Sequence, residues 1–289
     1  MHQVPLRGTT LTSSGIGLGT HALHHLYSGR ARQSLLSLGF DLGVRLFDTA
    51  PSYGAGLAER ELGRFARTRR GQVLLSTKVG IRAGRLARLP GGRFAAGAVR
   101  ALRAAAASGA PRQPMPPRDF GPAAVRASVE NSLRALDTDC IDIVHLHEPT
   151  IELLGETSEL ARVLEQLRAG GKLRYVGLSC ASGSEGARLA RAHPGLAQVL
   201  QVEIARAADG LPAQADPLPQ AGIRFLEFRA RAADTRVREH LGRLAAALAA
   251  QAARGVLLLS SGVARELATS IELMQRSEAP EAGATSALA

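Results

Sequence analysis

The chain has 289 residues, with 36 Lys and Arg against 25 Asp and Glu and few aromatic side chains. The positive charge consists mostly of arginines spread along the chain, and side chains that could stack on bases are scarce. We therefore expect no nucleic-acid partner. Arg-rich, solvated surfaces explain the charge most simply, and a phosphate-bearing small ligand is the alternative.

Two further features of the sequence argue against a membrane or a disulfide-rich secreted protein. The sequence contains neither a signal peptide pattern nor an apolar run of about 18 residues that could span a bilayer. Cys140 and Cys180 are too few for a disulfide framework or a metal-ligand set. We expect a cytoplasmic protein without a bound metal.

Short β-branched apolar runs alternate along the chain with Ala-, Leu- and Arg-rich stretches of helical period, which favours βαβ units and a parallel sheet. The expected elements, in chain order, are strand 16–20, helix 28–42, strand 45–49, helix 58–67, strand 73–79, helix 122–136, strand 141–147, helix 157–169, strand 174–179, helix 182–192, strands 199–204 and 223–228, helix 232–253, strand 256–260 and helix 264–276. Eight strands, nearly all followed by helices, predict a single (β/α)8 TIM barrel over residues 1–277 rather than a doubly wound sheet.

Three segments lie outside this alternation. Residues 1–14 are expected to form a hairpin that closes the barrel floor. The long connection at 80–121 is rich in Arg, Gly, Ala and Pro, and would lie over the carboxyl ends of the strands, where barrel sites are built. Residues 278–289 are small and polar, and are predicted to be a disordered tail.

Polar residues gather at the ends of three predicted strands. Asp48 and Lys78 lie near the ends of their strands, and His147 ends its own, while Tyr53 follows Asp48 closely. Because the strands of a parallel barrel all point one way, these ends meet at one face. Each residue alone is more often structural, but the four together indicate a catalytic site.

The four side chains have the chemistry of proton transfer to a carbonyl group. A phenol has a pKa of about 10, and an ammonium beside it favours the phenolate and lowers that pKa. A carboxylate paired with the ammonium would fix the position of the charge. An imidazole can orient a carbonyl oxygen or relay the proton.

Several stretches resemble motifs of the aldo-keto reductase superfamily, in the family's order. These are Phe-Asp-Thr-Ala-Pro-Ser-Tyr-Gly at 47–54, Glu-Arg-Glu-Leu-Gly at 59–63, Ser-Thr-Lys-Val-Gly at 76–80, 142–149 with His-Glu-Pro, and 171–179 with Gly-Leu-Ser. The resemblance covers residues 10–205. The long connection at 80–121 and the stretch at 119–142 are most similar to the bacterial and plant sugar (galactose-type) dehydrogenase branch.

The resemblance implies a (β/α)8 barrel that interconverts carbonyl compounds and alcohols with an NAD(P)(H) cofactor at its mouth. It places the proton donor on Tyr53, supported by Lys78, Asp48 and His147. The cofactor-binding residues that it implies are Gly19, Thr20, Ser179, Gln201, Phe228, Arg229, Ser260, Ser261 and Arg265. Arg265 near two serines suits a 2′-phosphate, so NADP(H) is favoured over NAD(H). The expected substrate is a small carbonyl compound or sugar.

Some positions depart from the family's pattern. Cys180 stands where the family has an Asn that holds the nicotinamide carboxamide, and Thr269-Ser270 replaces a Glu-Asn pair. For Arg229, simple solvent exposure is as good an explanation as pyrophosphate binding. His145, two residues before His147, is interpreted as a core residue. These departures leave a second hypothesis open, a nucleotide-binding barrel with a regulatory or scaffolding role and little turnover.

Overall fold

The structure is a computed structural model of the 289-residue chain. The residues that it describes are 3–6, 8–81, 117–203, 222–227, 255–260, 262, 264–265, 267–269 and 271–272, with the backbone alone for residue 203 and for 222–227. The predicted helix at 232–253, most of the connection at 80–121 and the tail at 278–289 lie outside the described residues.

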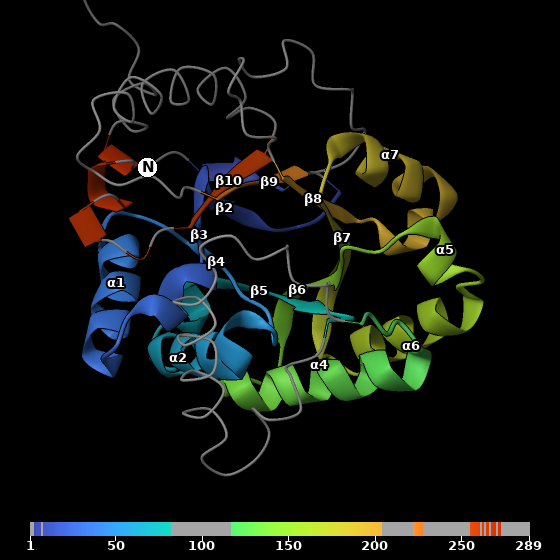
Figure 1. Ribbon diagram of the computed structural model, residues 1–289, viewed down its shortest axis with the longest axis horizontal. Helices are drawn as coiled ribbons and strands as arrows, with labels where there is room; N and C mark the ends of the chain where they lie inside the picture. Colours follow the sequence, from blue (N-terminus) through green and yellow to red (C-terminus); the bar gives the residue numbers. More distant parts are fainter. Residues whose placement is uncertain are drawn as a thin grey trace, which may run out of the picture.

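Eight parallel strands close into a barrel (Figure 1), which confirms the predicted fold. They are β3 (Ile16–Gly19), β4 (Leu46–Asp48), β5 (Leu74–Val79), β6 (Ile141–His147), β7 (Leu173–Cys180), β8 (Val199–Glu203), β9 (Gly222–Glu227) and β10 (Gly255–Ser260). Each strand follows its neighbour around the ring in chain order, and β10 pairs with β3 to close it. Every predicted strand is present, and each end lies within one residue of the prediction.

Helices lie around the outside of the barrel (Figure 1). They are α1 (Gly29–Asp41), α2 (Leu57–Ala66), α4 (Pro122–Leu136), the short α5 (Ile151–Leu154), α6 (Ser158–Ala169) and α7 (Gly183–Ala192). Ser182 caps α7 as expected, because its hydroxyl accepts a hydrogen bond from the Glu185 N–H. No helix within the described ranges is long and apolar enough to cross a membrane.

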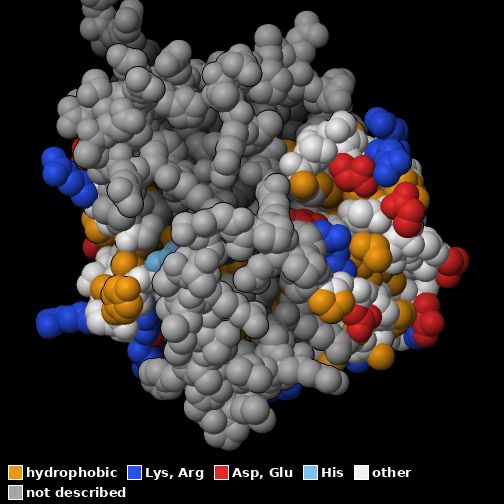
Figure 2. Space-filling view, in the orientation of Figure 1, with side chains coloured by type: hydrophobic (Ala, Val, Ile, Leu, Met, Phe, Trp, Pro, Cys, Tyr) orange, Lys and Arg blue, Asp and Glu red, His pale blue; other side chains and the backbone are white. Residues whose placement is uncertain are grey.

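Charged side chains of both signs are interspersed among apolar ones over the described part of the face shown in Figure 2. Partly or largely exposed ion pairs form along single helices, such as Arg168 with Glu165 on α6 and Arg188 with Glu185 on α7. This surface agrees with solvated arginines as the explanation of the charge.

Where the side chains of a strand are described, they alternate between the barrel interior and the helical layer. On β6, Ile143 belongs to the apolar cluster inside the barrel, whereas Val144 and Leu146 pack in the larger cluster that includes the helices. His145 and His147 therefore share the inward side with Ile143. Because all the strands are parallel, the polar residues at their carboxyl ends meet at the mouth of the barrel.

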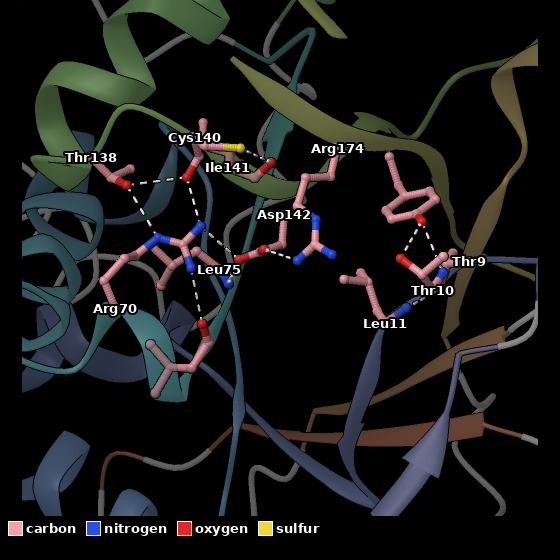
Figure 3. A network of polar contacts seen from close by, with 12 residues as sticks. Thr9, Thr10, Leu11, Arg70, Leu75, Thr138, Cys140, Ile141, Asp142 and Arg174 are labelled. Atoms are coloured by element: carbon pink, nitrogen blue, oxygen red, sulfur yellow. Dashed lines mark hydrogen bonds and ion pairs between the residues drawn. The ribbon is translucent and has the colours of Figure 1, made fainter. Parts of the chain in front are cut away.

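A hairpin closes the opposite end of the barrel, as the sequence predicts. Strands β1 (Gln3–Pro5) and β2 (Thr12–Ser14) pair antiparallel, and the turn between them carries Leu6 and Leu11 into the interior cluster. The Tyr175 hydroxyl accepts a hydrogen bond from the Thr10 N–H at 2.8 Å (Figure 3). The hairpin is thus joined to β7 by both apolar and polar contacts.

A buried carboxylate ties three strands together near this floor (Figure 3). Asp142 of β6 accepts a hydrogen bond from the Leu75 N–H of β5 at 2.8 Å. It also pairs with Arg70 at 2.9 Å and with Arg174 of β7 at 3.0 Å. Both carboxylate oxygens are satisfied, so the network stabilises strand pairing at the end of the barrel remote from His147.

Candidate active site

Asp48 lies at the carboxyl end of β4 and is completely buried. One of its carboxylate oxygens accepts a hydrogen bond from the Ser76 hydroxyl at 2.8 Å, and the other accepts one from the Lys78 ammonium. Because Asp48 pairs with Ser76 across β4 and β5, the strand register alone brings the carboxylate to the lysine. A buried carboxylate needs such partners to remain charged.

Lys78 projects from β5 into the barrel and is also buried. Burial acts to lower the pKa of this ammonium, but the charge of Asp48, the proximity of Tyr53 and hydrogen bonds with both residues outweigh it and raise the pKa. The amine also donates to the backbone oxygen of Thr49 at 3.2 Å. Lys78 therefore carries its positive charge inside the barrel, with Nζ 5.2 Å from the centre of the Tyr53 ring.

Tyr53 begins a short 3-10 turn, η2 (Tyr53–Gly56), which connects β4 to α2 at the mouth of the barrel. Gly54, Ala55 and Gly56 all have positive φ, and this conformation favours glycine. A Cβ on Gly54 would lie 2.6 Å from the Cβ of His24, so the position also requires glycine for space. The Tyr-Gly-Ala-Gly sequence thus fixes the turn that presents the tyrosine near Lys78.

Two imidazoles flank Tyr53. The His147 ring lies 6.2 Å from the tyrosine ring at an interplanar angle of 86°, and the His21 ring lies 4.9 Å away at 83°. His21 belongs to η1 (His21–His25), the turn that follows β3. The sequence analysis did not single out His21, because a lone histidine in a short irregular turn carries no pattern.

Both inward-facing histidines of β6 are held neutral. Burial, and then the charge of Lys78, lower the pKa of His147 well below its usual value. His145 lies one layer deeper, and the same two causes lower its pKa to about 3. A Cβ on Gly177 would lie 2.5 Å from His145 Nδ1, so the glycine makes room for this ring. His145 is thus a core residue, as the sequence analysis interpreted it.

Five of the expected cofactor-binding residues lie in a ring at the carboxyl ends of the strands. Gly19 pairs with Asp48 across β3 and β4, and the Thr20 N–H donates to the backbone oxygen of Asp48 at 2.8 Å. Ser179 of β7 pairs with both His147 of β6 and Gln201 of β8. Ser260, the fifth residue, ends β10.

Three buried polar atoms in this ring have no hydrogen-bond partner among the described residues. They are Thr20 Oγ1, Gln201 Oε1 and Ser260 Oγ. A buried polar atom without a partner is costly, and such atoms in native proteins usually bind a ligand or water. The ring therefore fits a polar ligand such as the amide end of a nicotinamide.

Four expected cofactor residues are not part of this ring as far as the structure describes them. Arg265 is exposed a few residues beyond β10, and Phe228, Arg229 and Ser261 lie outside the described residues. Cys180 packs in the apolar cluster with the helices rather than facing the interior, and burial raises the pKa of its thiol to about 12. Within the described ranges, no group of His, Cys, Asp and Glu could hold a metal ion.

Glu59 of α2 is a second residue whose role the sequence analysis did not find. Its buried carboxylate accepts a hydrogen bond from the Thr77 hydroxyl at 2.8 Å, directly beside Lys78 on β5. Burial raises the pKa of this carboxyl group above its usual value. Glu59 thus ties α2 to the strand that carries Lys78. Its place in the 59–63 motif was the available signal.

Residues 15–204 match the Aldo/keto reductase family. The chain belongs to the aldo/keto reductase family. The matched residues include Asp48, Tyr53, Lys78 and His147, together with most of the ring at the strand ends. They exclude everything from 205 onward, so the family match ends before β9, where the sequence also departs from the family's pattern.

Two curated relatives of the chain are sugar dehydrogenases by name. A D-threo-aldose 1-dehydrogenase from Pseudomonas is 35% identical over 147 residues, which cover 50% of this chain and 42% of that protein. An L-galactose dehydrogenase from Arabidopsis thaliana is 27% identical over 181 residues, covering 60% and 47%. The chain spans about half the length of the curated relatives it matches.

A solved structure supports the fold. The holo form of an aldo-keto reductase from Bacillus halodurans superimposes with a TM-score of 0.70 at 19% sequence identity, covering 95% of this chain and 91% of the other. The superposition covers a larger share of the chain than the family match over residues 15–204 does.

Proposed function

We propose that the protein is an NAD(P)(H)-dependent oxidoreductase that interconverts a carbonyl compound and an alcohol, with Tyr53 as the proton donor and acceptor. The observation that carries this proposal is the position of Tyr53, between the buried ammonium of Lys78 and the neutral imidazole of His147. All three side chains lie at the carboxyl end of the barrel strands, where TIM-barrel enzymes carry their active sites.

Lys78 makes the phenol of Tyr53 a better acid. In reduction, the phenol gives its proton to the carbonyl oxygen and becomes a phenolate, which the adjacent ammonium stabilises. In oxidation, the phenolate takes the proton of the alcohol. Asp48 does not need to contact the substrate, because its part is to keep the buried lysine charged.

His147 is suited to orient the substrate oxygen. Its neutral imidazole can donate one hydrogen bond and carries no positive charge. A preorganised donor of this kind stabilises a developing oxyanion. Its Nδ1 atom is buried without a hydrogen-bond partner among the described residues. The described part of the chain therefore leaves hydrogen-bonding capacity on this ring for a ligand.

The cofactor that fits the site is a nicotinamide dinucleotide, which when bound would exchange a hydride with the carbon of the substrate. Ser179 and Gln201 would hold its amide end, and Gly19, Thr20 and Ser260 lie in the same ring. We favour NADP(H), because the exposed Arg265 guanidinium is available to a 2′-phosphate. The proposed cofactor contacts that lie beyond the described residues are Phe228, Arg229 and Ser261.

The proposed setting is that of a cytoplasmic enzyme acting on a small carbonyl compound, aldehyde, ketone or aldose. Both cysteines are free, which agrees with a reducing compartment. The names of the two sugar dehydrogenases support the aldoses as candidates. We also propose that residues 1–277 form one barrel domain and that 278–289 are a disordered tail.

The test combines nucleotide binding with turnover. The protein is titrated with NADPH and NADH by fluorescence and then assayed on a panel of aldehydes and aldoses. Tyr53→Phe should bind nucleotide as the parent protein does and lose turnover by roughly 100-fold or more, because its proton donor is gone. Tyr27→Phe is the matched control, since Tyr27 is fully exposed.

Each result has a distinct meaning. Tighter binding of NADPH than of NADH supports the NADP(H) assignment, and equal binding contradicts it. Nucleotide binding without any turnover that depends on Tyr53 would favour the regulatory barrel instead. Failure to bind either nucleotide would contradict both functions.

A further inference from the structure

An ion pair crosses the mouth of the barrel beside His147. Arg118 Nη2 lies 2.5 Å from Glu148 Oε2. Glu148 directly follows His147 at the end of β6, and Arg118 pairs with Ile81 just beyond Lys78 at the end of β5. The pair therefore connects the chain segments that leave two adjacent strands, each of which carries a proposed catalytic residue at its last or next-to-last position.

The backbone that carries Arg118 is held firmly against β5. The bridge between Arg118 and Ile81 is extended by a hydrogen bond from the Asp119 N–H to the Gly80 oxygen at 2.9 Å. Gly80 has a φ of +107°, and a Cβ there would lie 2.2 Å from the Phe120 ring. The position thus requires glycine, and the close contact with Phe120 fixes the segment that presents the arginine.

Glu148 is held in an uncommon backbone conformation. Its φ is +50°, a left-handed conformation that is unfavourable for a residue with a side chain. Its N–H donates to the Ser179 oxygen at 2.7 Å, which keeps the turn in place. Strained residues of this kind cluster at functional sites, and here the strain directs a carboxylate toward Arg118 at the mouth.

The pair is neither fully buried nor freely solvated. The side chains of Arg118 and Glu148 are 19% and 34% exposed, so a ligand at the mouth can reach them. Arg118 Nε is buried and has no hydrogen-bond partner among the described residues, so the guanidinium has a donor that this part of the chain does not use. Glu148 contributes acceptor oxygens, and the two charges cancel.

This combination discriminates between classes of carbonyl compound. A hydroxyl group both donates and accepts, so adjacent hydroxyls can bond to a carboxylate and a guanidinium together. A simple aliphatic aldehyde has no hydroxyl groups to bond to either side chain, and a charged substrate gains no net attraction from a pair whose charges cancel. We propose that Arg118 and Glu148 form a subsite for the hydroxyl groups of a polyhydroxylated carbonyl substrate, the class of the aldoses. This inference rests on the proposed oxidoreductase function.

The experiment compares two substrate classes in the same variants. Wild type, Arg118→Met and Glu148→Gln are assayed for NADP⁺-dependent oxidation of a panel of aldoses and for NADPH-dependent reduction of butanal, which lacks hydroxyls. We expect kcat/KM for aldoses to fall roughly 10- to 100-fold, mainly through KM, because each variant removes a charge-assisted hydrogen bond. Butanal reduction should stay within about threefold, since it does not use the pair.

The matched control removes a carboxylate from an ion pair far from the mouth. Glu165→Gln breaks the exposed pair with Arg168 on α6 and should leave both activities unchanged. Nucleotide affinity and the circular dichroism spectrum of each variant confirm that it is folded. Both variants are needed, because loss of Arg118 alone could also alter the anchoring of its segment.

The outcomes separate the subsite from the proposed function. Equal losses on aldoses and butanal would show that the pair acts through His147 or the fold, and would overturn the subsite. Unchanged aldose kinetics in both variants would overturn it as well. A wild type that reduces butanal and oxidises no aldose contradicts the subsite and leaves the oxidoreductase standing, whereas turnover of neither substrate contradicts both.

Discussion

Lys78 illustrates how a single buried residue depends on its neighbours. A lysine alone in a barrel would lose its proton at neutral pH, because burial favours the neutral amine. Asp48 reverses this tendency and is itself fixed by the Ser76 hydroxyl. The lysine and its carboxylate could be predicted from the ends of their strands. Ser76 could have been found from the same alternation, since it lies two residues before Lys78 on β5.

A pH prediction follows from His145. The folded state holds this ring neutral to about pH 3, whereas the unfolded chain takes up a proton below its ordinary pKa of about 6.5. Stability is therefore complete above pH 6.5 and falls as the pH decreases toward 3. We expect a loss of about 2 kcal/mol from His145 between pH 8 and pH 5. His147, whose pKa is lowered too, adds a loss of the same sign.

Urea unfolding followed by circular dichroism at pH 8 and pH 5 measures this effect. His145→Gln should reduce the difference between the two pH values, because glutamine does not titrate. His25→Gln is the control, since His25 is exposed on η1 and its ring does not contact Tyr53. An unchanged pH difference in His145→Gln would contradict the assignment of the acid sensitivity to this ring.

Helix α2 is the element that joins the proposed catalytic residues to the outer layer. It follows the turn that presents Tyr53, and Glu59 bonds it to β5 beside Lys78. Gly63 lets α2 approach the last residue of α4, because a Cβ there would lie 2.5 Å from the Leu136 backbone oxygen. The close spacing of α2 and α4 therefore depends on the absence of a side chain at Gly63.

We predict that Gly63→Ala destabilises the protein. The new methyl group meets backbone rather than a mobile side chain, and we expect a loss of roughly 1–3 kcal/mol, although alanine in a helix is intrinsically better than glycine by up to about 1 kcal/mol. Urea unfolding measures the change. Gly183→Ala, at the first residue of α7 with no neighbouring atoms within 4 Å, should lose no stability. A Gly63→Ala protein as stable as the parent would contradict close helix packing.

Regular elements were predictable because they have a period, whereas the turns between them were not. Alternating apolar residues located the barrel strands to within one residue at each end. The short helix α5 and the turn η1 have too few residues to show a period, so His21 beside Tyr53 was missed. Glu59 was missed because Thr77, which bonds it, lies 18 residues away in the sequence.

The residues that stabilise the fold and the residues proposed to be catalytic lie at opposite ends of the barrel. The hairpin, the interior apolar cluster and the Asp142 network lie at one end, and the proposed catalytic residues lie at the other. Changes at the floor should therefore affect unfolding more than turnover, as is general for this architecture. The barrel as a whole could be predicted from the sequence, because eight repeated units leave few alternative topologies.

Leu6→Ala tests this separation. Leu6 is completely buried at the floor, and the cavity should lower the free energy of unfolding by roughly 2–5 kcal/mol. At 25 °C, kcat should change by less than about twofold, because the floor does not contact the substrate. Leu153→Ala is the control, since this leucine is 45% exposed. A large fall in kcat with unchanged stability would contradict the division of roles.

The pairing of β10 with β3 also sets an order of events during synthesis. Leu257 lies opposite Ile16 in this ladder, so the first barrel strand must wait for the last one to leave the ribosome. Until β10 has left the ribosome, the nascent sheet has an open edge, a surface that favours aggregation or chaperone binding. Tyr53, Lys78 and His147 are translated long before that, yet they can act together only after the ring has closed.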